Sequence, residues 1–222
     1  MDYHATLQEI RKRCRIAMNG EASAGMRKYG LVYKLNFGLM ISQIKEIASR
    51  YNPDAELATL LWEQDTRELK ILATMLLPIN EFTDELASKW TLDIPNQEMR
   101  EQIAINLLQQ LPNAEKLSLE WAQSENESLR ATAYWLLGRL LLTGKLNSFD
   151  KLNGLPHIWS DTLGEDVVLR NSALVCFKQI GRRNPVLGES ILAEISNFQT
   201  GNETLRKEVH DNLAFEFAYF AE

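Results

Sequence analysis

Five basic side chains recur along the sequence, each four residues after a residue of a type that caps helices. A basic group can bind a phosphate, and each phosphate that it neutralises adds salt-dependent affinity for a nucleic acid. It can equally form an ion pair between neighbouring repeats, and both interpretations stay open here. The basic residues are Lys70, Arg100, Arg130, Arg170 and Arg206. The acids near them in sequence are Asp65, Glu101, Glu125, Glu165 and Glu203.

These basic residues belong to an internal repeat. Four places before each of them stands Thr, Asn or Asp, whose side chain can accept a hydrogen bond from a free amide at a helix start. Apolar residues follow each cap after three, seven and eleven places, so they share one face of a helix. The caps are separated by 30, 30, 40 and 36 residues and are Thr66, Asn96, Asn126, Asp166 and Asn202.

A helix with one apolar face must bury that face, and a second helix precedes each cap. Stacked helix pairs of this length form a solenoid, and alternating β patterns are missing, so we predict an all-α fold, an α-α superhelix. We expect a single domain over 1–222, with an N-terminal helical cap over 1–51 and repeated pairs over 52–222. The expected elements are helices 2–18 and 39–50, a glycine-rich bend over 19–38, and the pairs 54–63 with 66–77, 83–90 with 96–111, 113–123 with 126–142, 148–163 with 166–182, and 185–198 with 202–220. We expect the helix over 148–163 to be interrupted at Gly154 and Pro156.

Composition describes an ordinary globular chain with a net charge of −6 and 45% hydrophobic residues. That charge argues against a protein coated in basic residues for nucleic acid, but it allows a local basic face. The first helix supplies one candidate, because Arg11, Lys12, Arg13 and Arg15 lie within it; a solvated face and a phosphate-facing patch both fit. We see no transmembrane run and no signal sequence, and therefore expect a cytoplasmic monomer without a membrane role.

The common catalytic motifs are missing from the sequence. It has no phosphate-binding glycine loop, dinucleotide fingerprint, nucleophile elbow or zinc-ligand spacing, so we expect no metal and no cofactor. Cys14 and Cys176 are far apart and are expected to be buried, reduced thiols. Three tryptophans fall late in first helices, where packing is their expected role: Trp62, Trp90 and Trp121.

Several short motifs, in order and at similar spacing over about residues 25–215, resemble the AlkD-type DNA alkylation repair proteins. They include Tyr29-Gly30-Leu31, Phe37-Gly38, Leu60-Leu61-Trp62-Glu63, Glu68-Leu69-Lys70, Trp90-x2-Asp93-Ile94, Leu129-Arg130 and Arg182-Arg183-Asn184-Pro185. The resemblance implies a C-shaped stack of HEAT-like helix pairs with a basic concave face for duplex DNA. Active members of that family are glycosylases that release cationic N3- or N7-alkylated purines without a metal. A carboxylate and aromatic faces stabilise the sugar cation electrostatically.

The sequence departs from this family at the expected active site. Gln97 stands where the family has a tryptophan, and Glu101 where it has the catalytic aspartate. Val175 occupies the place of a second tryptophan, whereas Arg130 matches the family's arginine. Glu101 is therefore the candidate catalytic group. The candidate DNA-binding residues are Gln97, Arg100, Arg130, Arg170, Lys178, Arg182 and Arg183.

Three functions fit this combination of features. The first is a duplex-DNA-binding repair protein with weak, altered or absent alkylpurine N-glycosylase activity. The second is a helical-repeat scaffold that binds a protein partner and has no DNA role, which the acidic net charge favours. The third is an active glycosylase that uses Glu101.

Overall fold

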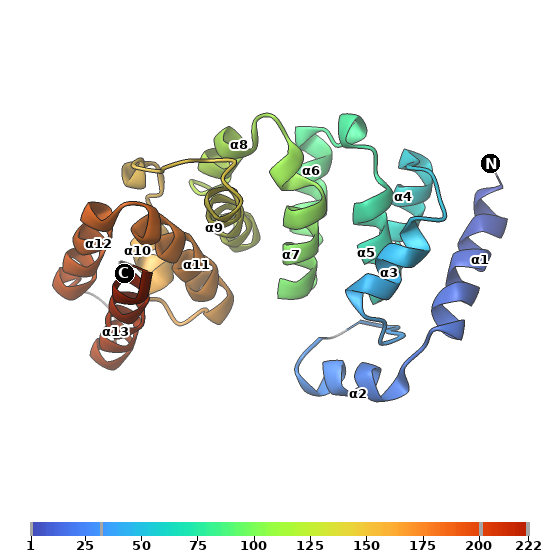
Figure 1. Cartoon of the computed structure of the whole chain (residues 1–222), viewed down its shortest axis with the longest axis horizontal. Helices are drawn as coiled ribbons and strands as arrows, with labels where there is room; N and C mark the ends of the chain where they lie inside the picture. The colour runs from blue at the N-terminus through green and yellow to red at the C-terminus, as the bar shows by residue number, and fades with distance from the viewer. Residues whose placement is uncertain (1, 32, 200–201, 221–222) are drawn as a thin grey trace. The chain divides into compact units, whose positions relative to one another are not determined.

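The computed structural model describes residues 2–31, 33–199 and 202–220, and these fold into helices as the sequence predicts. Within these ranges there is no β-strand, and the one β-type contact is an isolated bridge between Leu35 and Thr66. Contacts divide the chain into two compact units, Met1–Gln110 and Leu111–Glu222. Figure 1 shows the helices of each unit in chain order. The expectation of a single domain stays a prediction.

The first unit packs its later helices as consecutive pairs. Helix α4 packs on α5, and α5 packs on α7, which is the second helix of the next pair. The indole rings of Trp62 in α4 and Trp90 in α6 stack with centroids 4.2 Å apart. The helices are α1 (Tyr3–Ile16), α2 (Gly20–Lys28), α3 (Ile41–Ala48), α4 (Ala55–Trp62), α5 (Arg67–Leu76), α6 (Asp84–Leu92) and α7 (Gln97–Asn106).

The second unit repeats the same arrangement. Helix α8 packs on α9, α10 packs on α11, and α9 packs along α11, while α12 and α13 complete the stack against α11. Short 3-10 turns occur between helices in the described parts of both units, at Ile79–Glu81 and Leu108–Gln110 in the first unit and at Leu152–Gly154 in the second. The helices are α8 (Ala114–Trp121), α9 (Glu127–Leu142), α10 (Ile158–Thr162), α11 (Val167–Arg183), α12 (Pro185–Asn197) and α13 (Glu203–Phe220).

The repeat read from the sequence corresponds to the second helix of each pair. Asn96, Asn126, Asp166 and Asn202 accept hydrogen bonds from backbone amides at the starts of α7, α9, α11 and α13, which satisfies groups that a helix start leaves free. Thr66 precedes α5 without a side-chain cap bond. The apolar residues at cap plus seven and cap plus eleven are buried: Ala73, Ile103, Ala133, Ala173, Val209, Leu77, Leu107, Leu137, Phe177 and Leu213.

Three expected boundaries were wrong. Residues Gly20–Lys28 form α2 rather than a bend, because the Asn19 side chain accepts from the Ala22 amide and starts a helix despite nearby glycines. The helix expected to reach residue 111 ends at Asn106, where a 3-10 turn follows. The helix expected over 148–163 forms only after its expected interruption at Gly154 and Pro156, as α10, and a 3-10 turn over Leu152–Gly154 replaces its first part.

Each unit buries one cysteine. Cys14 in α1 and Cys176 in α11 are free thiols with no exposed surface, as expected. Burial raises the pKa of each thiol to about 12, so both remain protonated at neutral pH.

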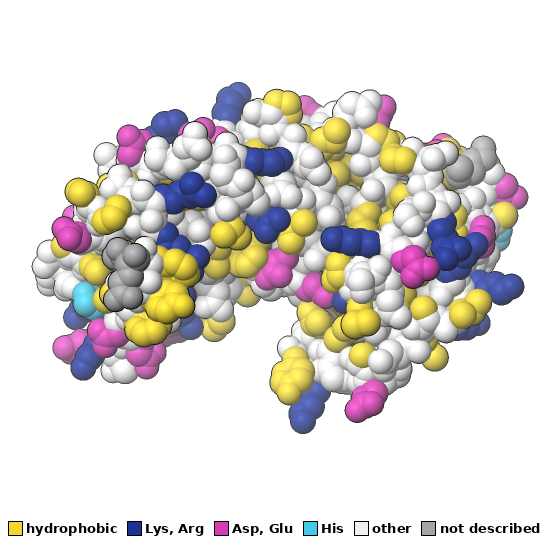
Figure 2. All heavy atoms as spheres, viewed as in Figure 1, with side chains coloured by type: hydrophobic (Ala, Val, Ile, Leu, Met, Phe, Trp, Pro, Cys, Tyr) yellow, Lys and Arg dark blue, Asp and Glu magenta, His cyan; other side chains and the backbone are white. Residues whose placement is uncertain are grey.

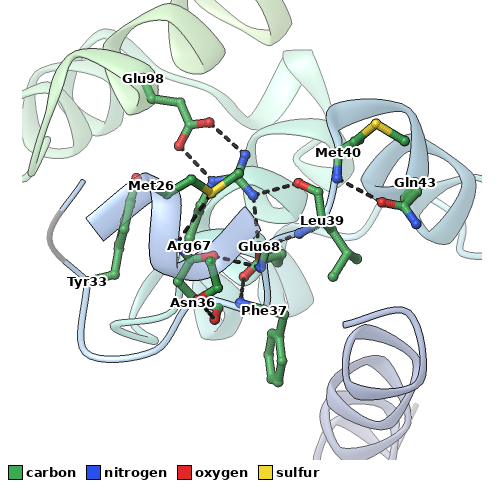
Figure 3. Close-up of polar contacts among 12 residues, drawn as sticks. Met26, Tyr33, Asn36, Phe37, Leu39, Met40, Gln43, Arg67, Glu68 and Glu98 are labelled. Atoms are coloured by element: carbon green, nitrogen blue, oxygen red, sulfur yellow. Dashed lines mark hydrogen bonds and ion pairs between the residues drawn. The ribbon is translucent and has the colours of Figure 1, made fainter. Parts of the chain in front are cut away.

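Buried charges attach the segment 33–39 to α5 (Figure 3). The carboxylate of Glu68, which has no exposed surface, accepts from the amides of Phe37 at 3.0 Å and Leu39 at 3.2 Å. Arg67 donates to Glu68 at 2.9 Å and to the Leu39 carbonyl at 2.8 Å. It also forms a two-pronged ion pair with Glu98 of α7, at 2.8 and 2.7 Å. A connection without secondary structure thereby has its backbone groups satisfied.

Gly38 within this segment has φ +74°, and a Cβ there would lie 2.2 Å from the Asn19 carbonyl oxygen and 2.7 Å from the Ser23 amide nitrogen. Gly30 has φ +88°, but a Cβ there would have open space around it.

Gly30→Ala should therefore lower the free energy of unfolding only by the left-handed backbone cost, about 1 kcal/mol. Gly38→Ala adds overpacking against backbone atoms and should cost about 3 kcal/mol in total. Urea denaturation measures both, and equal losses would contradict the close approach.

Candidate nucleic-acid interface

Four of the five basic residues of the repeat donate to backbone carbonyls at or after the end of the preceding helix. Lys70 Nζ donates to the Trp62 carbonyl at 2.8 Å, and Arg130 Nη1 donates to the Glu125 carbonyl at 3.0 Å. Arg170 donates to the Gly164 carbonyl at 2.7 Å, and Arg206 to the Phe198 carbonyl at 2.5 Å. Trp62 is the last residue of α4, and the other acceptors lie beyond the ends of α8, α10 and α12, so each contact joins a second helix to the connection before it.

Two of these residues also reach the following pair. Lys70 forms an ion pair with Asp93 at 3.0 Å and lies 4.5 Å from the Trp62 ring centroid. Arg130 Nε lies 2.8 Å from Asp161 of α10, and the Tyr134 hydroxyl donates to the same carboxylate at 2.8 Å. The partners are thus carboxylates 23 and 31 residues further on, rather than the acids beside each basic residue in sequence.

The candidate catalytic group lies on α7 in the first unit. Glu101 is half-buried, and burial raises its pKa; Gln97, which donates to it at 3.5 Å, and the neighbouring Arg100 act in the opposite direction. Arg100 is buried and donates to the Gln97 side-chain oxygen at 2.8 Å. The three residues therefore lie together on one turn and side of a helix. Their role in catalysis or DNA binding stays a prediction.

The remaining candidates lie on α11 in the second unit. Lys178 Nζ is 3.6 Å from a Glu216 oxygen, and Arg182 forms an ion pair with the other oxygen of that carboxylate. The side chains of Lys178 and Arg182 keep 26% and 25% of their surface exposed, against 16% for Glu216. Arg182 also lies over the Phe220 ring at 3.7 Å. Arg183 is exposed, and it has no ion pair among the described residues.

Val175, at the position where the family resemblance implies a second tryptophan, packs against α9. Val175 is half-buried, and a Cβ at Gly138 of α9 would lie 2.9 Å from Val175 Cγ1 and 3.1 Å from the Val175 carbonyl oxygen. The backbones of α9 and α11 therefore approach closely here because Gly138 lacks a side chain. Val175 is held against this contact and offers no aromatic face.

Sequence analysis missed two side chains that organise these contacts. Asp161 could not be linked to Arg130 from the sequence, because this contact depends on how two helix pairs stack. Glu68 stands in the first turn of α5, where an acid usually lies at the surface and interacts favourably with the helix dipole. The sequence therefore gave no sign that Glu68 is buried. An acid in the first turn of a helix, directly before an apolar face, is only a weak sequence signal for a buried ion pair of this kind.

On the face drawn in Figure 2, Lys and Arg side chains of each unit stand singly or in small groups among polar and apolar surface. Over the described ranges, His, Cys, Asp and Glu form no group of three that could hold a metal ion. None of the described helices has the length and apolar character needed to cross a bilayer.

Comparison with solved structures gives a match over 97% of this chain and 95% of the other, with a TM-score of 0.68 and 14% sequence identity. That structure is described as "a new family of proteins related to the HEAT-like repeat DNA glycosylases with affinity for branched DNA structures". The shared fold defines the present chain as an α-α solenoid of HEAT-like repeats. Residues 10–152 match the family described as DNA alkylation repair enzyme, and the chain belongs to this family. Among curated proteins no sequence matches it.

Arg130→Met tests whether the repeat cation is structural. The change would leave the buried Asp161 carboxylate with Tyr134 as its remaining partner and should lower the free energy of unfolding by about 3 to 5 kcal/mol. Arg130→Met with Asp161→Leu should recover much of that loss, because no unpaired charge stays buried. Thermal and urea unfolding of both variants provide the measurement. A loss below 1 kcal/mol in the single variant would exclude the structural role.

Proposed function

We propose that the chain binds duplex DNA and has weak or absent alkylpurine glycosylase activity. Membership of the DNA alkylation repair family carries this proposal. The partly exposed basic residues of α11 support it, since Lys178, Arg182 and Arg183 are placed on one stretch of a surface helix. The matched solved protein has affinity for branched DNA structures, so a branched substrate belongs in the test.

The case for low activity rests on the chemistry near Glu101. A sugar cation needs an ionised carboxylate and flanking aromatic faces, as the family resemblance implies. Burial disfavours the ionised form of Glu101, and the neighbouring Arg100 offsets its negative charge. Gln97 and Val175 supply no ring where the family has tryptophans.

A protein-binding scaffold is the second candidate. Large apolar side chains are exposed on α13, where Phe215 and Tyr219 keep 73% and 67% of their surface accessible. The repeat cations are also occupied by carbonyls and carboxylates of the protein itself. A stoichiometric protein partner together with no DNA binding would select this function. The cytoplasmic location and monomeric state stay predictions.

DNA binding can be measured by fluorescence anisotropy with labelled linear and branched duplexes at 50 and 200 mM salt. We expect micromolar or tighter binding at the lower salt concentration and clear weakening at the higher one. Glu216→Gln should tighten binding about threefold, because it frees Lys178 and Arg182 for phosphate. Glu194→Gln removes an exposed acid of α12 and is the charge-matched control. No binding at 50 mM salt to either DNA would refute the proposal.

Activity can be measured as release of 7-methylguanine from methylated duplex DNA. We expect release close to the uncatalysed rate, and Glu101→Gln should leave DNA affinity unchanged within about twofold, because the neighbouring Arg100 already offsets the charge that the change removes. Enzymatic release that disappears in Glu101→Gln would instead establish the active glycosylase.

A further inference from the structure

Positive charge is concentrated near the start of the chain. Residues 10–40 contain seven Lys and Arg but one acid, a net charge of +6, so the rest of the chain carries −12. This stretch comprises the second half of α1, all of α2 and the segment that Glu68 holds against α5. A local excess of this size in an acidic protein indicates a polyanionic partner.

Part of this charge faces a hollow of about 620 Å³ in the first unit. Arg11 and Arg15 of α1 and Lys34 of the segment 33–39 line it. Arg11 is held in place by Gln64, whose side-chain oxygen accepts from it at 2.5 Å. Arg15 and Lys34 are exposed and have no ion-pair partner among residues 2–31, 33–199 and 202–220. These two charges are available to a ligand.

The backbone that carries Lys34 is fixed. The Leu35 amide donates to the Asp65 carbonyl and the Arg67 amide donates to the Leu35 carbonyl, each at 3.1 Å. Two residues further on, the Phe37 amide is bound by Glu68. The lysine is thus presented at the rim by an ordered segment, which lowers the entropy cost of binding.

The acids in the hollow limit the charge that a ligand can carry. Glu63 and Asp65 line the same hollow, so its five charged groups have a net charge of +1. This balance suits the single negative charge of a phosphodiester better than a phosphate monoester or pyrophosphate, which the acids would repel. We propose that Arg11, Arg15 and Lys34 form a subsite for one or two phosphodiesters of a nucleic-acid backbone. This inference rests on the proposed DNA binding and adds a contact outside the α7, α9 and α11 residues.

The test compares the salt dependence of duplex binding by the full chain and two double variants. Arg15→Gln with Lys34→Gln removes the two exposed charges and should weaken binding about tenfold at 50 mM salt. The slope of log affinity against log salt should become less negative by about 1.8, which is 0.9 for each lost phosphate contact. Lys45→Gln with Lys89→Gln removes two exposed charges of the same unit and should change the slope by less than about 0.5.

A third variant gives the opposite effect. Glu63→Gln with Asp65→Asn removes the repelling acids and should tighten binding about threefold. Wild-type binding with equal slopes in the two basic variants would overturn the subsite alone. Absence of wild-type binding would instead refute the proposed function. Weaker binding by this third variant, with an unchanged unfolding temperature, would also count against the subsite.

Discussion

The helix pairs depend on a requirement of the backbone: the carbonyls where a first helix ends and its connection to the second helix begins need hydrogen-bond donors. A long basic side chain four residues after the next cap supplies these donors from the second helix. Lys70, Arg130, Arg170 and Arg206 all make this contact, although the carbonyl acceptor lies six to eight residues before them. Since the contact joins the second helix of a pair to the end of the first helix or to the connection between them, its recurrence follows from the architecture before any ligand is considered.

Basic residues therefore serve two purposes in this protein. Those of the repeat are committed to carbonyls and, for Lys70 and Arg130, to carboxylates of the next pair. Those at the end of α11 and around the N-terminal hollow are more accessible and are loosely paired or unpaired. In the proposed function these accessible residues bind phosphate, whereas Lys70 and Arg130 of the repeat stabilise the fold.

Periodicity made the repeated helices predictable, because caps such as Asn126 and Asp166 and the apolar residues behind them act within one helix. Sequence spacing gave both interpretations of Arg130 but could not identify Asp161, since that choice depends on how two helix pairs stack. Likewise, Gly38 was a motif residue whose close approach to Asn19 became evident only from the folded backbone. The predicted candidates on α7 were local and are indeed neighbours, whereas the residue facing Val175 lies on another helix and had no sequence signal.

The two cysteines, one in each unit, have a practical consequence. Both thiols are fully covered, and their raised pKa values make them unreactive while the helices around them stay closed. Modification by a thiol reagent then requires local opening, and its rate reports the free energy of that opening. The native chain thus carries an internal reporter of breathing motions for each unit, and ligand-induced protection of Cys14 could be compared with that of Cys176 without introducing a label.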